Sequence, residues 1–443
     1  MPIVLPLTTA AAQGELNYVT GRLVYAGEGG NEVRRSILPG GVRVITERMP
    51  SQRSVSIGFW VGVGSRDEQP GMLGSTHFLE HLLFKGTEKR SALDIAQAFD
   101  EVGGESNALT AKEHTCYYAR ALDDDTQMAI NVIADMVTSA RLDDADMEQE
   151  RGVILEEIAM DQDDPTDVAF ENHIEQLMGT NPLGRPIGGN PEEIMNVSRE
   201  AVYEHYKKFY TPDRLVVSAA GSLDHSQIVS YVLAALENSG WNLTEGVMPS
   251  PRRVRSATLI SPASAHLELD KGFEQTNIVV GRPSIIAGDE RCYAMSVLTS
   301  ALGGGMSSRL FQEIREKRGL AYSTFAFSGT YSDAGYFGMY AGCLPAKTEQ
   351  VQEIMYREFE QLVREGLGDA ELSKVLGQLG GATILGSEDA GSRMSRLGRA
   401  ELDAGEFSTL DEILHGVRSV THRDIKELLE FLAQQPEVTT IVR

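Results

Sequence analysis

Apolar residues recur at two spacings along the chain, alternating in some stretches and following a helix face in others. The stretch 36–46 predicts a strand, a tight turn and a second strand. Further strand patterns occupy 55–63, 114–122 and 215–221. Helical patterns occupy 93–99, 125–138 and 226–236. The chain is therefore predicted to contain both strands and helices.

The pattern begins again in the second half of the 443-residue chain. Tyr118-Ala119-x-x-Leu122-x-x-x-Thr126 resembles Tyr340-Ala341-x-x-Leu344-x-x-x-Thr348, and Leu142-x-Asp144-Ala145 resembles Leu367-x-Asp369-Ala370 at nearly the same offset. Such self-similarity predicts two copies of one fold. A stretch of Gly and Pro among polar and basic residues predicts a linker between them. We expect an N-terminal arm at 1–30, a first domain at 31–238, the linker at 239–255 and a second domain at 256–443.

The stretch 74–84 predicts a helix that carries two histidines on one face. His77 and His81 are four residues apart, so both imidazoles can reach one metal ion. Glu80 is offset from that face and can contact a metal-bound water without being a ligand. Ser75 or Thr76 can cap the helix. His-x-x-Glu-His is a zinc-peptidase motif, although a lone histidine pair on a half-buried helix is usually structural.

A catalytic zinc site needs a third protein ligand, and the helical pattern at 148–158 offers one. Glu150 and Glu157 are seven residues apart, which places them on the same face two turns apart. Glu156 points elsewhere and is expected in solvent. Seen alone, an acidic face like this is more often a solvated surface.

Several further motifs, together with these two helices, resemble the M16 metallopeptidase family. The closest subgroup is that of the mitochondrial processing peptidase β-type subunit and its bacterial relatives. The matching stretches run in family order and comprise His77-Phe78-Leu79-Glu80-His81, Phe84-Lys85-Gly86-Thr87, Asn107-Ala108-Leu109-Thr110, Pro182-Leu183-Gly184-Arg185-Pro186, Gly305-Met306-Ser307-Ser308-Arg309-Leu310 and Lys317-Arg318-Gly319-Leu320-Ala321-Tyr322-Ser323.

The resemblance implies a zinc endopeptidase that binds one Zn²⁺ per chain through His77, His81 and Glu157. It makes Glu80 the general base and Glu150 a supporting carboxylate. The resemblance also implies that the glycine-rich stretch 102–110 is an edge strand that pairs with substrate through Asn107 and Ala108. Main-chain pairing of this kind holds any extended peptide. Without the family, an ordinary buried strand would be the simpler interpretation.

The second half contains no His-x-x-Glu-His, so only the first half is expected to hold metal. Arg315 and Tyr322 share a face if their helix runs unbroken, which Gly319 makes uncertain. The resemblance implies that this pair binds substrate near the scissile bond, across a closed chamber. It also implies an α+β fold of two duplicated α/β-roll domains. Each is a mostly antiparallel sheet with helices on one face, and together they form half of a clamshell. We therefore expect a homodimer in which each chain completes its partner's site. A catalytically silent scaffold or regulatory subunit of the same fold is the alternative.

Composition narrows the partners. The net charge of −24 argues against nucleic acid as a partner, because its phosphates would be repelled. The same charge weakly favours basic or neutral peptides as substrates. No apolar run approaches the ~20 residues of a membrane helix. Three cysteines without a Cys-x-x-Cys pattern fit a reducing compartment, and the N-terminus lacks a targeting signature, so we expect a bacterial cytoplasmic protein. The sequence leaves open which peptides are cut, the native metal, and homodimer versus heterodimer.

Overall fold

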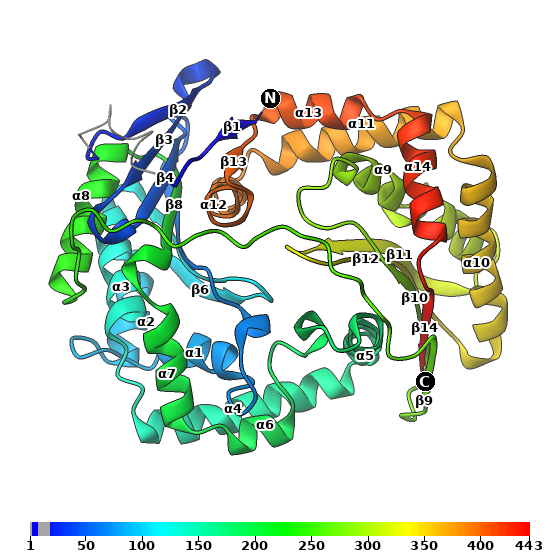
Figure 1. Cartoon of the computed structure of the whole chain (residues 1–443), viewed down its shortest axis with the longest axis horizontal. Coiled ribbons are helices and arrows are strands. Elements are labelled where there is room, and N and C mark those ends of the chain that lie inside the picture. The colour runs from blue at the N-terminus through cyan, green and yellow to red at the C-terminus, as the bar shows by residue number, and fades with distance from the viewer. Residues whose placement is uncertain (1, 8–17) are drawn as a thin grey trace. The chain divides into compact units, whose positions relative to one another are not determined.

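The computed structural model describes residues 2–7 and 18–443, so part of the predicted N-terminal arm lies outside the described residues (Figure 1). The chain forms two compact units, each assembled from separate segments. The first unit contains Met1–Glu156, Ile187–Arg253 and Leu385–Thr409. The second contains Glu157–Pro186, Val254–Ile384 and Leu410–Arg443. The domain boundaries expected from the repeat treat each half as one continuous stretch, and they stay a prediction. Each compact unit, in contrast, contains segments from both halves of the chain.

The first unit is built on a seven-stranded sheet in the order β2-β3-β4-β8-β5-β7-β6. All neighbours are antiparallel except β4 and β8. The strands of this unit are β1 (Ile3–Val4), β2 (Arg22–Ala26), β3 (Glu32–Ile37), β4 (Arg43–Arg48), β5 (Ser54–Val61), β6 (Glu105–Thr110), β7 (Thr115–Leu122), β8 (Leu215–Gly221) and β13 (Glu406–Phe407). Its helices are α1 (Ser75–Leu83), α2 (Ala92–Asp100), α3 (Thr126–Ser139), the part of α4 (Asp144–Asp163) up to Glu156, α6 (Pro191–Asn196), α7 (Arg199–Phe209), α8 (His225–Asn238), α12 (Ala390–Arg399) and the π-helix Ala400–Ala404.

Both faces of this sheet are covered, which explains why every residue of β8, and every residue of β5 after its first, is buried. Helices α3 and α8 pack on one face, and α12 packs against β4, β5 and β8 on the other. Gly398 of α12 lies against the Trp60 indole so closely that a Cβ there would stand 2.3 Å from a ring atom. Glycine is therefore required where α12 crosses the sheet.

The second unit repeats the same strand connections in a five-stranded sheet, β11-β12-β10-β14-β9. As in β6-β7-β5-β8-β4, the neighbours are antiparallel until the last pair, which is parallel. Its strands are β9 (His266–Leu269), β10 (Thr276–Pro283), β11 (Ala321–Thr330), β12 (Gly335–Cys343) and β14 (Val438–Val442). Its helices are α5 (Pro165–Met178), α9 (Cys292–Gly303), α10 (Thr348–Glu365), α11 (Asp369–Gly386), α13 (Leu410–Arg418), α14 (His422–Ala433) and the π-helix Phe311–Glu316.

The predicted α+β class with two duplicated halves is confirmed. The helix before β11 does not run unbroken from Arg315 to Tyr322, so the condition for these two residues to share a helix face is not met. The π-helix ends at Glu316, Gly319 adopts a φ of +59°, and Tyr322 belongs to β11. Within residues 2–7 and 18–443, no helix is both long and apolar enough to cross a bilayer.

Candidate metal centre

Helix α1 is anchored at its start by a carboxylate from the preceding loop. The backbone N–H groups of Gly74 and Thr76 donate to Glu68, at 2.8 and 2.7 Å. The expected cap by Ser75 or Thr76 is wrong, because Gly74 occupies the N-cap with a φ of +85° and no side chain of its own. Since the N-terminus of a helix attracts negative charge, the buried Glu68 holds α1 in place at the end nearer His77.

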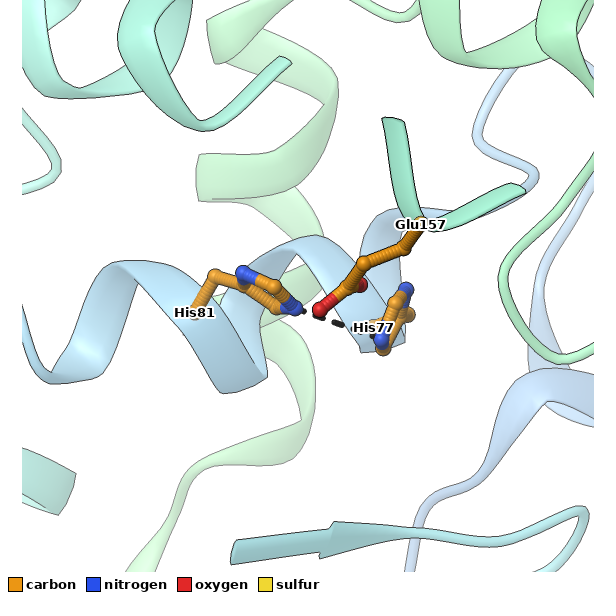
Figure 2. Close-up of side chains that lie close together, drawn as sticks. All are labelled: His77, His81 and Glu157. Atoms are coloured by element: carbon orange, nitrogen blue, oxygen red, sulfur yellow. Dashed lines mark hydrogen bonds between the residues drawn. The ribbon is translucent and has the colours of Figure 1, made fainter. Parts of the chain in front are cut away.

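Helices α1 and α4 bring three metal-ligand side chains together. His77, His81 and Glu157 each offer a donor atom, and these atoms all lie within 4.8 Å of one another (Figure 2). The two Nε2 atoms are 3.3 Å apart, and the imidazole rings are nearly perpendicular, at 82°. Two imidazoles bound tetrahedrally at zinc–nitrogen distances of 2.0–2.1 Å would place their nitrogens about 3.3–3.4 Å apart. The donor set and its spacing therefore fit a zinc ion.

Glu157 reaches this cluster because α4 is one continuous helix. The boundary between the compact units falls inside α4, directly after Glu156. The preceding part of the helix is fixed in the first unit through the buried side chains of Met147, Glu150 and Ile154. Glu157 follows Glu150 by two turns on the same face and is half-buried, whereas Glu156 is exposed to solvent.

Glu150 supports the cluster from behind. Its Oε2 lies 3.0 Å from His81 Nδ1, and its Oε1 lies 2.6 Å from Lys85 Nζ. A carboxylate at Nδ1 favours the tautomer with the proton on Nδ1, which leaves the Nε2 lone pair directed at the metal position. Sequence reasoning overlooked Lys85, which lies two residues beyond the end of α1 and four residues after His81.

Glu80 is oriented by the end of the edge strand. Thr110, the last residue of β6, donates its hydroxyl hydrogen to Glu80 Oε2. The phenols of Tyr117 and Tyr210 lie nearby and hydrogen-bond each other at 2.9 Å. Burial raises the pKa of both phenols, and the negative charge of Glu80 adds to this shift. Glu80 therefore has a fixed carboxylate beside neutral phenols.

Asn107 and Ala108 lie on β6, the terminal strand of its sheet. Ala111 N donates to His114 O at the hairpin end, so this pair is hydrogen-bonded. By the alternation of antiparallel ladders, Ala108 directs its backbone groups away from β7. Its N–H is instead taken by Asn107 Oδ1 of the same strand, at 2.8 Å. β6 thus offers an open edge whose donor is covered by a movable side chain.

Arg315 and Tyr322 belong to the second unit and contact each other there. The Arg315 guanidinium stacks 4.5 Å from the centroid of the Tyr322 ring, and its Nη1 donates to the Tyr322 carbonyl at 2.9 Å. The Tyr322 side chain is 79% exposed. The pair forms through the turn at Gly319, so its members meet without sharing a helix.

The duplicated fold and the His-x-x-Glu-His helix facing an acidic helix define the class of inverted zinc-peptidase domains. Residues 43–191 match the model of insulinase (peptidase family M16), and residues 196–379 match the peptidase M16 inactive domain. The chain belongs to peptidase family M16, as its motifs predict.

Its relatives align over most of their length. It is 45% identical to an uncharacterized zinc protease of Streptomyces coelicolor, over 98% of this chain and 95% of that protein. It is 37% identical to the uncharacterized zinc protease YmxG of Bacillus subtilis, over 88% of this chain and 92% of that protein. A solved protease from Helicobacter pylori superposes with a TM-score of 0.83 at 20% identity, covering 93% of this chain and 100% of that one. A peptidase M16 inactive domain from Pseudomonas fluorescens superposes with a TM-score of 0.81 at 18% identity, covering 93% of this chain and 97% of that one. These two structures support the fold alone.

Proposed function

We propose that this protein is a zinc-dependent endopeptidase that cleaves extended peptides or presequence-like segments. The observation that carries the proposal is the convergence of His77, His81 and Glu157, with the Glu80 carboxylate beside them. The chemistry that zinc supplies when bound is Lewis acidity, which polarises a carbonyl and brings the pKa of a water molecule down toward ~7. Glu80 accepts the proton of the attacking water and returns it to the leaving amine.

The other residues bind and orient. Glu150 holds His81 in the ligating tautomer, and the open edge of β6 pairs with the peptide backbone through Asn107 and Ala108. The exposed phenol of Tyr322 donates a hydrogen bond to the developing oxyanion. Arg315, stacked on that ring, binds the peptide near the scissile bond.

We further propose that the chamber is formed by a homodimer, in which Arg315 and Tyr322 complete the site of the partner chain. Residues 196–379, which match the M16 inactive-domain model, contain no His-x-x-Glu-His motif. This supports different roles for the two halves, with metal binding in the first and substrate binding in the second. The small number of cysteines, three in the chain and none in a Cys-x-x-Cys pattern, supports a reducing compartment such as a bacterial cytoplasm.

The test is zinc content measured together with cleavage of a mixed peptide library, with and without chelator. We expect about one zinc per chain and cleavage that chelation abolishes. Glu80→Gln should keep its zinc and lose turnover, because the amide cannot accept the proton. A zinc-loaded chain that cuts no peptide would support the regulatory or scaffold alternative instead.

Sharing of the site is tested by mixing a Glu80→Gln chain with a Tyr322→Phe chain. Each variant alone should be inactive or nearly so. The mixed dimer should recover part of the activity, since one of its sites then has both residues intact. Mixed chains that exchange subunits but remain silent would rule out completion of the site in trans.

A further inference from the structure

The face of β6 opposite the metal helix opens onto a pocket of about 820 Å³ within the first unit. Its floor is formed by Trp60, Cys116 and Tyr118 of the sheet, and one wall by Met394 and Ser395 of α12. Leu109 of β6 lies at its rim, with 51% of its side chain exposed. The volume lies within the ~300–1,000 Å³ typical of ligand sites, and the metal centre uses none of these side chains.

The register of the sheet explains which side chains line the pocket. Directly paired residues share a face, and β6 pairs Asn107 with Tyr118 and Leu109 with Cys116. Their side chains face α12, because Cys116 packs in the same buried cluster as Met394. The alternate residue Thr110 faces α1, where it bonds Glu80.

A peptide paired with the open edge would follow the same alternation. Every second side chain of that peptide would stand next to Asn107 or Leu109 and point over the pocket. The side chains between them would point toward the metal helix. The edge and the pocket therefore form one recognition surface. Only every second side chain of the peptide contacts the pocket, and the register of pairing decides which ones these are.

The pocket lining favours large apolar side chains. Trp60, Cys116 and Met394 are buried and apolar at its base, and the Trp60 Nε1–H is already satisfied by Ser218 Oγ at 2.8 Å. Besides Met394 and Arg399, the side of α12 that faces the pocket carries small residues, namely Gly391, Ser392 and Ser395. The exposed charges at the rim are two acids and two bases, so they do not select for charge: Glu105, Arg120, Asp389 and Arg399.

We propose that this pocket is a specificity subsite that receives large apolar side chains at alternate positions of the bound peptide. The inference rests on the proposed peptidase function and names what that site selects. Differences of this kind in an apolar pocket amount to about 10- to 200-fold in specificity.

The first test fills the pocket. Ser395→Phe places a phenyl group on the α12 wall, and Ser230→Phe on the exposed side of α8 is the matched control. We expect the zinc-loaded wild type, tested on a positional peptide library, to prefer Leu, Met or Phe at one position of the peptide. A second preferred position, if there is one, should lie two residues away, with one unselected residue between them. Ser395→Phe should shift that preference toward Gly, Ala or Ser by about tenfold or more. Ser230→Phe should leave the profile unchanged.

The second test reads the geometry without catalysis. The chain has two tryptophans, Trp60 and Trp241, so Trp241→Phe leaves Trp60 as the reporter at the pocket floor. In a chain that also carries Glu80→Gln, a peptide with nitrophenylalanine moved one position at a time should quench Trp60 at alternate positions only. The cleavage site of the same peptide in the wild type fixes the register.

The outcomes separate this inference from the peptidase proposal. If the wild type cut no peptide while Trp60 quenching still alternated along the peptide, the peptidase proposal would be refuted and the subsite proposal would stand. Cleavage with a profile that Ser395→Phe does not change, or quenching equal at neighbouring positions, would overturn the pocket and keep the activity. If Ser395→Phe altered self-association instead of the profile, the pocket would be a contact between chains and the inference would be wrong.

Discussion

The strongest quantitative test of the metal centre is Glu150→Gln, which changes a charged acceptor behind His81 without changing its shape. Glu150 is 2% exposed and lies 3.0 Å from His81 Nδ1. A hydrogen bond to a charged group contributes about 1.5–3 kcal/mol, against about 0.5–1.5 kcal/mol for a neutral one. The neutral amide should therefore weaken the support of His81 by about 1–1.5 kcal/mol, which corresponds to roughly 5- to 13-fold in zinc affinity.

Lys85 adds to this loss. Its ammonium lies 2.6 Å from Glu150 Oε1 in the wild type, and neutralising Glu150 leaves that positive charge uncompensated close to a divalent cation. The total should fall within the 10- to 100-fold typical of residues that orient a metal ligand. The measurement is zinc affinity by competition with a chelator, carried out on both proteins at the same pH of 7.5 or above.

Glu156→Gln is the matched control, since Glu156 lies on the same helix and is exposed. It removes the same charge from α4 and should leave zinc affinity within about twofold, because an exposed charge is screened. If Glu150→Gln bound zinc as tightly as the control, the role assigned to the Glu150–His81 contact would be wrong. Equal losses in both variants would point to the net charge of α4 as the cause.

Three further perturbations address the base, the anchoring of α12 and the response to acid. Thr110→Val should lower kcat about tenfold at unchanged zinc content, because Glu80 loses the hydroxyl that fixes it. Glu401→Gln should lower the free energy of unfolding by about 3–5 kcal/mol, because buried guanidiniums lose their carboxylate. Burial lowers the pKa of His205 and His225 to about 4, against 6.5 when unfolded. Their stabilisation is complete above pH 6.5 and should fall by about 3 kcal/mol each as the pH drops toward 4.

Each of these has its own control. Thr110→Ser keeps the hydroxyl and should retain kcat. A loss of activity in Thr110→Ser as large as that in Thr110→Val would contradict the assigned hydrogen bond. Glu406→Gln removes an exposed carboxylate near the same segment and should leave the unfolding midpoint nearly unchanged. For the acid response, His225→Gln should reduce by about one the number of protons taken up on unfolding between pH 4 and 6.5. An unchanged proton uptake would mean that His225 titrates normally in the folded chain.

Local pattern predicted the elements and the repeat well. Helical spacing placed His77 and His81 on one face and Glu150 with Glu157 on another, because these relations depend on helix geometry alone. The convergence of the two helices was an inference from the family, since no local spacing fixes a distance between separate elements. The expected cap of α1 failed for the same reason: Glu68 reaches back from a loop whose path the sequence pattern does not encode.

The return of residues 385–409 to the first unit was also beyond local reasoning. The reason becomes visible in the contacts of Glu401, which is fully buried and bound by Arg35 at 2.6 Å and by Arg252 at 2.9 Å. A buried carboxylate without such partners would be strongly unfavourable, so this network ties the segment to the first unit. Arg35 and Glu401 are separated by 366 residues, and charge pairing at that range leaves no periodic signal.

Strand β6 links the separate parts of the proposed site. Its terminal Thr110 fixes the Glu80 carboxylate on the face of the metal helix. Its open edge presents the backbone of Ala108, and its Leu109 lines the pocket on the opposite face. Because one strand fixes all three, a peptide that pairs in the correct register places its scissile bond and its alternate side chains at the same time. A shift of one residue would exchange the two faces, so an apolar side chain would lose the pocket while the scissile bond moved away from Glu80. Backbone pairing that accepts many sequences can therefore still give a preferred cleavage position.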